Sequence, residues 1–145
     1  MKIRPYTPAD DESTIALLRL NTPQYFSPEE EMDLRDYFAN HIDHYFVVED
    51  NGNIIGSGGI NITNNGRNAA LSWDIIHPDY QGKGVGSRLT QHRLDAIKTI
   101  EGIENISVRT SQLVYKFYEK FGFVLQEVVK DYWAEGIDMY RMEMK

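Results

Sequence analysis

Three glycines at alternate positions make the segment from Gln81 to Ser87 the part of the chain best suited to binding an anion. A run of apolar residues that ends at Ile76 leads into it through a proline, and the pattern that follows is helical. The first backbone N–H groups of a helix lack partners within the helix and carry partial positive charge. Glycines let a phosphate approach those groups without a Cβ in the way, and Lys83 and Arg88 add positive charge. The segment therefore predicts a phosphate site, with a tight turn that binds nothing as the alternative.

Two common phosphate-binding motifs do not fit this segment. The dinucleotide pattern GxGxxG would need glycine where the chain has Ser87, and it belongs in a first βαβ unit rather than late in a chain. The nucleotide-hydrolase pattern GxxxxGK[ST] does not occur in the sequence. A dinucleotide-binding fold is therefore a weak alternative, and nucleotide hydrolysis is excluded.

Two segments of the chain resemble one family. The run Gln81-Gly82-Lys83-Gly84-Val85-Gly86 is similar to [Q/R]xxGx[G/A], the acetyl-CoA signature of the GCN5-related N-acetyltransferase (GNAT) superfamily, and residues 76–80 resemble its V-x-P-x-[Y/F] lead-in. Residues 117–123, Phe-Tyr-Glu-Lys-Phe-Gly-Phe, are similar to the recurrent [F/L]-Y-E-K-x-G-F of that family. Both segments in this order make the resemblance specific over residues 76–123, and elsewhere it extends only to the order of elements.

The resemblance implies an acetyl-CoA site. Backbone N–H groups of the glycine segment would hold the CoA pyrophosphate, and the strand end at residues 75–77 would pair with the pantetheine arm. An N–H group near Ile76 would stabilise the oxyanion. Gln112 stands near the place where the family often has an asparagine that contacts pantetheine. The residues assigned to acetyl-CoA in this way are Ile75, Ile76, His77, Gln81, Gly82, Lys83, Gly84, Val85, Gly86, Ser87, Gln112 and Tyr118.

Acetyl transfer from a thioester to an amine requires a neutral amine, a donor for the oxyanion and a proton for the departing thiolate. Holding the two reactants at attack distance supplies much of the acceleration, so a covalent nucleophile is not needed. By resemblance, Tyr118 matches the tyrosine that protonates the thiolate in many members of the family. A tyrosine that only packs is the alternative at this position.

A general base is harder to assign. Some members of the family carry a glutamate on the strand before the glycine segment or on the strand after its helix, and neither stretch has one here. Asp74 is the carboxylate within the first of these strands, and alternation predicts it on the same face as Ile76 and Ser72. A carboxylate among apolar residues must be paired or must face a cleft, which makes Asp74 the candidate. His77 or a water molecule could remove the proton instead.

Two groups of aromatic residues are candidates for the acceptor side. The early helical region commonly covers the acceptor in the family, and residues 130–139 are distantly similar to the acceptor hairpin of the ribosomal-protein alanine N-acetyltransferases. Ser107 stands where the catalytic glutamate of that subfamily would fall, so its substrate is not carried over. Aromatics of the core or rim, and a plain β-hairpin, are the alternatives. The candidates are Tyr25, Phe26, Tyr37, Tyr132 and Trp133.

Size and composition limit the classes of protein to which the chain can belong. A chain of 145 residues with 41% hydrophobic content fits one globular domain, residues 1–145. The net charge of −7 argues against nonspecific nucleic-acid binding; it suits a cationic amine substrate, and equally a solvated acidic surface. Without cysteines and with four scattered histidines, we expect neither a metal site nor a cysteine nucleophile. With no membrane-spanning run and no signal-peptide core, we expect a soluble, cytoplasmic protein that does not bind membranes.

The elements that must position these residues alternate between strand and helix. Turn signals such as Asn51-Gly52 separate the strands, and the capping signals Thr7-Pro8 and Ser27-Pro28-Glu29-Glu30 begin two helices. Strands are expected at Lys2–Thr7, His44–Glu49, Asn53–Ile62, Ala69–Ile76, Asn105–Arg109, Phe123–Lys130 and Asp138–Met144, and helices at 8–20, 28–42, 84–100 and 111–121. This order predicts an α+β fold with three layers, the GNAT fold, in which about four helices flank a mixed, mostly antiparallel sheet of about seven strands.

The sequence therefore predicts an acetyl-CoA-dependent N-acetyltransferase. The acceptor would be a primary amine, either a small amine or a peptide N-terminus, that attacks directly in a ternary complex. The alternative is a non-catalytic acyl-CoA-binding module that keeps the fold and the glycine segment. Exposed hairpin edges often dimerise in this fold, so a homodimer stays open.

Overall fold

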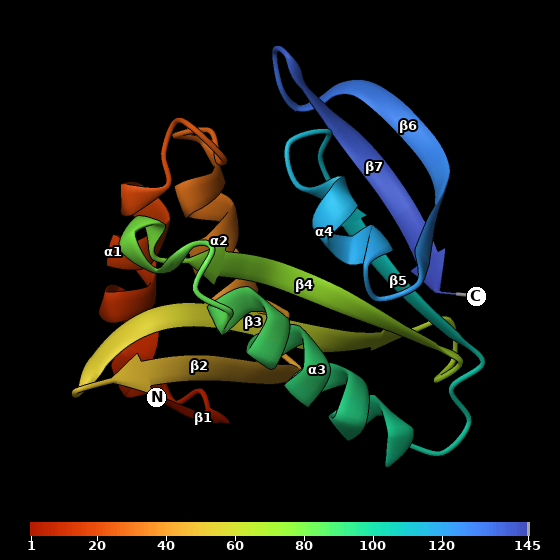
Figure 1. Cartoon of the computed structure of the whole chain (residues 1–145), viewed down its shortest axis with the longest axis horizontal. Coiled ribbons are helices and arrows are strands. Elements are labelled where there is room, and N and C mark those ends of the chain that lie inside the picture. The colour runs from red at the N-terminus through yellow and green to blue at the C-terminus, as the bar shows by residue number, and fades with distance from the viewer. Residues whose placement is uncertain (145) are drawn as a thin grey trace.

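The computed structural model describes residues 1–144 and contains one mixed sheet of seven strands, in the order β1-β2-β3-β4-β5-β7-β6 (Figure 1). Neighbouring strands are antiparallel except for β4 and β5, which are parallel. The strands are β1 (Lys2–Pro5), β2 (His44–Asp50), β3 (Asn53–Thr63), β4 (Asn68–Ile76), β5 (Asn105–Thr110), β6 (Phe123–Ala134) and β7 (Ile137–Met144).

Helices cover both faces of the sheet, so the molecule has three layers. Figure 1 shows α3 crossing in front of the sheet, while α1 and α2 lie side by side at its left end. Ile75 of β4 packs with the apolar residues of α1 and α2, whereas Leu71 of the same strand packs beneath α3. The helices are α1 (Asp11–Leu20), α2 (Glu30–Asn40), α3 (Val85–Lys98) and α4 (Tyr115–Glu119). The predicted α+β fold, with three layers and a mixed, mostly antiparallel sheet of seven strands, is thereby confirmed.

The two predicted capping signals act close to where the sequence places them. The Asp10 carboxylate accepts a hydrogen bond of 2.8 Å from the Thr7 N–H, which caps a short 3₁₀ turn that leads into α1. Glu30 likewise reaches back to the Ser27 N–H at 2.7 Å and begins α2. The buried face of α1 includes Ile15, Leu17 and Leu18.

The parallel pair β4–β5, joined through α3, opens along its length. The two strands pair only from Asn68 to Leu71 of β4, which lie beside residues Asn105 to Val108 of β5. Beyond Leu71 the two strands no longer pair, although β4 continues to Ile76 and β5 to Thr110. The backbone N–H and C=O groups on these facing edges therefore do not pair with the neighbouring strand and can bind a ligand between the strands.

A bulge in β4 changes the predicted alternation of side chains. Gly59 pairs with Ser72 and Ser57 pairs with Ile75, so Trp73 and Asp74 both lie opposite Gly58. Trp73 has a φ of 52°, in the left-handed region. The extra residue places Ser72 beside Tyr37 of α2 and Asp74 beneath α3. The expectation that Asp74 shares a face with Ser72 is therefore wrong, whereas Ile76 does pack on the α3 side.

The C-terminal hairpin is longer than the sequence predicts. The predicted loop from Asp131 to Gly136 is mostly strand, because β6 continues to Ala134 and a tight turn at Gly136, with a φ of 79°, leads into β7. The register of pairing between β6 and β7 shifts between Val129 and Ala134. The predicted helix at 111–121 is only the short α4, preceded by a turn in which the Val114 and Tyr115 N–H groups bond to Ser111 O.

Candidate active site

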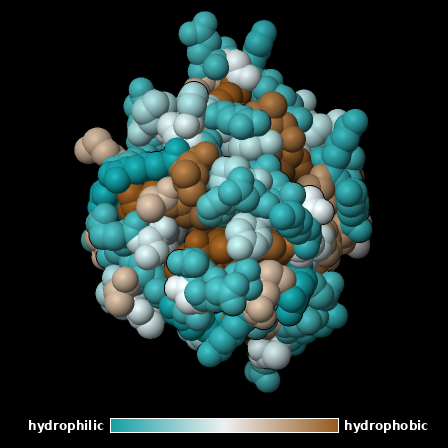
Figure 2. Space-filling view, turned by 60° about the vertical axis from the view of Figure 1, so that its left-hand side comes forward, coloured by the Kyte–Doolittle hydropathy of each residue, from teal (hydrophilic) through white to brown (hydrophobic). Residues whose placement is uncertain are grey.

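A cleft of about 840 Å³ lies where β4 and β5 separate. It runs from the glycine segment before α3 to the aromatic residues between α1 and α2 and the β6–β7 hairpin. Figure 2, turned toward α1 and α2, shows apolar surface lying mostly in hollows between hydrophilic side chains. A cleft of this size, between diverging strands of the sheet, is the place where a ligand would bind. Among the predicted residues that line it are Tyr25, Phe26, Asp74, Ile76, Gln81, Gly82, Gly84, Gly86, Ser87, Tyr118 and Trp133.

The last residues of the glycine segment begin α3, and their N–H groups are free of helical hydrogen bonds. Gly82 and Gly84 have φ angles of 76° and 85°, which residues with a Cβ rarely adopt. The Arg88 N–H reaches back to Gly84 O at 3.0 Å, so the N–H groups of residues 85–87 lie ahead of the first helical hydrogen bond. These features suit a diphosphate at the helix N-terminus. Gly86 packs closely on Phe117 of α4, since a Cβ there would lie 3.4 Å from that ring.

The end of β4 presents its main chain to the same cleft. The His77 N–H donates to Ile55 O of β3 at 2.8 Å, so alternation turns the N–H and C=O of Ile76 away from β3. Asn21, buried at the end of α1, confirms this direction because its Nδ2 donates to Ile76 O at 3.0 Å. The Ile76 N–H, in the region where the resemblance predicts the oxyanion donor, therefore lies on the open edge of β4.

Sequence reasoning missed Asn21. Its side chain also donates to Leu17 O at 3.0 Å and accepts from Gln81 Nε2 at 3.3 Å, so it joins α1, β4 and the glycine segment. The available signal is an amide directly after the helix predicted at 8–20, a position that is typical of a helix end.

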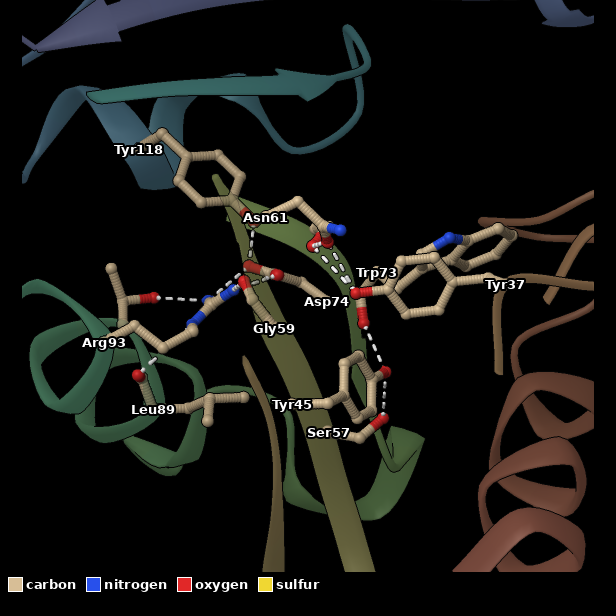
Figure 3. A network of polar contacts seen from close by, with 12 residues as sticks. Tyr37, Tyr45, Ser57, Gly59, Asn61, Trp73, Asp74, Leu89, Arg93 and Tyr118 are labelled. Atoms are coloured by element: carbon tan, nitrogen blue, oxygen red, sulfur yellow. Dashed lines mark hydrogen bonds and ion pairs between the residues drawn. The ribbon is translucent and has the colours of Figure 1, made fainter. Parts of the chain in front are cut away.

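Tyr118, Asp74 and Arg93 form one polar cluster inside the cleft (Figure 3). Arg93 projects from α3 and donates to both oxygens of Asp74, from Nη1 to Oδ1 at 2.5 Å and from Nη2 to Oδ2 at 2.7 Å. The Tyr118 hydroxyl, from α4, donates to Oδ2 of the same carboxylate. Two residues proposed from the sequence, Tyr118 and Asp74, are thus in direct contact.

Arg93 is the third member of the cluster, and the sequence analysis did not single it out. Its side chain is fully buried, and Nη1 also donates to Gly59 O at 3.1 Å. The signal was present in the helical pattern, because Arg93 falls four residues after Leu89 and four before Ile97, on the apolar stripe of α3. A cation at such a position needs a buried partner, and Asp74 is that partner.

The cluster alters the acidity of Tyr118. Burial raises the pKa of its hydroxyl well above the usual value, and the negative charge of Asp74 raises that pKa further. The positive charge of Arg93 lowers it. Tyr118 is therefore protonated at neutral pH.

The aromatic candidates fall into two groups. Tyr25, Phe26 and Trp133 line the cleft, where Phe26 stacks on Trp73 with ring centroids 6.2 Å apart. The Trp133 Nε1 donates to Thr110 O at 2.9 Å and fixes that ring against β5. Tyr37 is buried and donates to Asn61 Oδ1 at 2.6 Å, while Tyr132 lies 48% exposed on β6.

The side chains of several residues predicted to touch acetyl-CoA make contacts within the protein. Ile75 and Val85 are buried in the apolar clusters on opposite sides of the sheet. His77 accepts a hydrogen bond of 3.1 Å from the Asp79 N–H through Nδ1, and Lys83 lies over the Tyr80 ring. Gln112 donates to Gly136 O at 2.7 Å and accepts from the Asp138 N–H at 2.9 Å, so both ends of its amide tie down the β6–β7 turn.

Two further features of residues 1–144 bear on the class of protein. No group of three or more His, Cys, Asp or Glu side chains within this range is placed to bind a metal. In the same range, none of the helices combines the length and the apolar character that crossing a membrane requires.

Sequence comparisons identify the family. The model of the acetyltransferase (GNAT) family matches residues 14–123. N-alpha-acetyltransferase RimI of Mycobacterium tuberculosis is 29% identical over 105 residues, which cover 68% of this chain and 64% of that protein. N-alpha-acetyltransferase 30 of Schizosaccharomyces pombe is 32% identical over 69 residues, 46% of this chain and 45% of that protein. The chain thus spans less than two thirds of the length of either relative.

Structural comparisons agree over almost the whole chain. The ribosomal-protein alanine N-acetyltransferase from Escherichia coli superposes with a TM-score of 0.81 at 17% identity, covering 99% of this chain and 92% of that one. A mutant of the spermidine N-acetyltransferase SpeG from Vibrio cholerae gives a TM-score of 0.73 at 25% identity, with 99% and 94% covered. An aminoglycoside 6'-N-acetyltransferase complexed with coenzyme A gives 0.80 at 16% identity, with 99% and 96% covered. The chain belongs to the acetyltransferase (GNAT) family.

Proposed function

We propose that this protein is an acetyl-CoA-dependent N-acetyltransferase that acts on a primary amine. The observation that carries the proposal is the arrangement along one cleft of a helix N-terminus with free N–H groups, an open strand edge at Ile76 and the hydroxyl of Tyr118. These are the parts that thioester binding, oxyanion stabilisation and proton donation require.

On the donor side, acetyl-CoA supplies an activated acetyl group as a thioester. The N–H groups of residues 84–87 would hold its diphosphate, and Gly82 and Gly84 keep the approach clear, since a Cβ at either would meet no atom within 4 Å beyond the adjacent residues. The open edge of β4 would hold the pantetheine arm as a neighbouring strand would. The Ile76 N–H then donates to the carbonyl oxygen as negative charge develops on it.

Tyr118 is the group proposed to protonate the leaving thiolate. The C–N bond forms as the C–S bond breaks, the proton moves from the Tyr118 hydroxyl to sulfur, and a phenolate remains. The amine loses one proton, and a proton returns to the phenolate before the next turnover. Because both Asp74 oxygens already accept hydrogen bonds from Arg93 and Tyr118, we assign Asp74 to holding Tyr118 rather than to the role of a free base. Water then carries the amine proton away.

The acceptor would enter between α1–α2 and the β6–β7 hairpin. Tyr25, Phe26 and Trp133 line this end of the cleft and form apolar walls that suit the carbon chain beside an amino group. Relatives named as N-alpha-acetyltransferases, and the SpeG structure named for spermidine, support a peptide N-terminus or a small amine as acceptor.

A non-catalytic acyl-CoA-binding module is the second candidate, and the engagement of both Asp74 oxygens favours it. Two experiments separate the candidates. Calorimetry should show acetyl-CoA binding, and thiol release should then rise in the presence of some members of a panel of polyamines, amino acids and short peptides. Binding without turnover across the panel would favour the module, and a failure to bind CoA would end both proposals.

A further inference from the structure

We propose that Arg93 is a positioning residue for acetyl transfer: it holds Asp74, and through Asp74 it fixes the position of the Tyr118 hydroxyl (Figure 3). The inference rests on the function proposed above, because it explains how Tyr118 can serve there as an acid. Arg93 itself is fully buried and would act through the other two residues.

The guanidinium is fixed from several sides. Besides its two bonds to Asp74, it donates from Nη1 to Gly59 O of β3 at 3.1 Å and from Nε to Leu89 O of α3 at 3.4 Å. Because the planar guanidinium of Arg93 binds both oxygens of the Asp74 carboxylate, it holds that carboxylate in one orientation. Asp74 is only 19% exposed, so little room remains for it to turn.

The backbone around the pair is shaped to admit it. The bulge at Trp73, whose φ is 52°, turns Asp74 toward α3. The opposite residue is Gly58, where a Cβ would lie 3.0 Å from Arg93 Nη1 and 3.1 Å from Asp74 Oδ1. Two irregular features of the sheet thus coincide at one ion pair.

The fixed carboxylate sets the direction of the phenol. The Tyr118 hydroxyl donates its hydrogen to Asp74 Oδ2, which places the phenolic oxygen at the border between the ion pair and the cleft that Tyr118 lines. Its ring is held at the same time by Phe117 and Phe123, with centroids 5.1 Å and 5.8 Å away. The side chain is therefore constrained at both ends.

The charge of Arg93 matters when Tyr118 gives up its proton. The phenolate that forms lies beside the Asp74 carboxylate, and two adjacent negative charges in a buried site repel strongly. Asp74 from β4 and Arg93 from α3 are the charged groups that face Tyr118, and they act on its pKa in opposite directions. Arg93 thus offsets the negative charge that would otherwise hold the proton on oxygen.

Stability alone is a weak reason for such a pair. Apolar residues of similar volume often replace a buried ion pair without loss, because desolvation cancels much of the attraction between the charges. This pair lies against the cleft and touches the proposed acid, which is where altered acidity serves a reaction.

The test follows the ionisation of Tyr118 and turnover in four proteins: the natural chain, Asp74→Asn, Arg93→Met and the double variant. Tyrosine labelled with ¹³C at Cζ reports ionisation by NMR during a pH titration. The protein has nine tyrosines, and the signal lost in Tyr118→Phe identifies the one of interest. Thiol release gives kcat and KM, and circular dichroism confirms folding.

In Asp74→Asn we expect the Tyr118 hydroxyl to ionise at a pH at least about one unit lower than in the natural chain. In the double variant it should ionise at an intermediate pH. Arg93→Met should lower kcat about 10- to 100-fold, the order of loss for a misplaced catalytic group, and change KM for acetyl-CoA less than about threefold. A Tyr118 signal that titrates identically in the natural chain and in Asp74→Asn overturns the inference. So does an Arg93→Met variant with natural kcat.

If either single variant fails to fold because it leaves a buried charge unpaired, the double variant decides. In the double variant, ionisation of Tyr118 at a lower pH than in the natural chain, together with a reduced kcat, supports the inference. An ionisation pH and a kcat equal to those of the natural chain overturn it. The titration needs no turnover, so it stands if the transferase proposal fails, while an inactive protein with the expected titration would contradict only the proposed function.

Discussion

The side-chain nitrogen of Asn21, at the end of α1, lies 3.0 Å from the main-chain oxygen of Ile76, at the end of β4. This bond joins α1, at the end of the cleft proposed for the acceptor, to the strand proposed to bind the donor. The same nitrogen donates to Leu17 O, so the side chain is held in its own helix as well. One buried amide therefore fixes the distance between the two halves of the cleft.

Replacing Asn21 by alanine should weaken both the fold and acetyl-CoA binding. Loss of the buried hydrogen bonds leaves two carbonyl groups unsatisfied, which costs about 1–3 kcal/mol. We expect urea denaturation to show this loss, and KM for acetyl-CoA to rise as the end of β4 loses its anchor. Asn40→Ala is the control, because that amide bonds only at the surface, to Asp36, and neither quantity should change there.

Replacing Gly84 by alanine should reduce acetyl-CoA affinity. The φ of 85° is strained for alanine by about 1–2 kcal/mol, and the new methyl group points into open space where the diphosphate would lie. Gly52→Ala is the matched control, since Gly52 has a φ of 81° and equally open surroundings in the distant β2–β3 turn. Both variants should lose similar stability in thermal denaturation, and only Gly84→Ala should bind acetyl-CoA more weakly by calorimetry. Equal affinities in the two variants would contradict the phosphate site.

Replacing Tyr118 by phenylalanine should lower kcat by about 10²- to 10⁴-fold, the usual contribution of general acid catalysis. Acetyl-CoA affinity should stay near normal, because the ring and its packing on Phe117 remain. Tyr115→Phe, on the same short helix, removes a hydroxyl from a ring that packs on Tyr140, and its kcat should not change. Unchanged thiol release in Tyr118→Phe would remove this tyrosine from the mechanism.

Acid should remove a defined part of the stability through Asp10. The hydrogen bonds from Arg4 hold the pKa of Asp10 below its ordinary value, with further help from the Thr7 N–H. A carboxyl whose pKa is lower in the folded state contributes its full stabilisation above the unfolded pKa, about 3.9, and loses it as the pH falls through the folded pKa. In urea denaturation, Asp10→Asn should therefore be less stable than the natural chain at pH 7. The difference should shrink steadily below about pH 4; a constant difference would show that the ion pair plays no part.

The sequence by itself determined the order of elements and the position of the glycine segment before α3. Turn signals and apolar periodicity are local properties, and so is the need for glycine at a left-handed position, as Gly82 and Gly84 show. Capping is equally local, and Glu30 reaches the Ser27 N–H three residues earlier. These features were predictable because they depend on residues close together in the chain.

Tertiary structure alone decided which polar side chains meet. Asp74 contacts Arg93 and Tyr118 only because a bulge at Trp73 inserts one residue into β4, and a strict period of two hides that insertion. Asn21 bonds to Ile76, 55 residues away, only because α1 packs beside the end of β4. Partners of this kind are set by packing and strand register, which depend on the whole chain. The sequence thus named many of the residues that line the cleft, and the fold decided how the groups within it are held and charged.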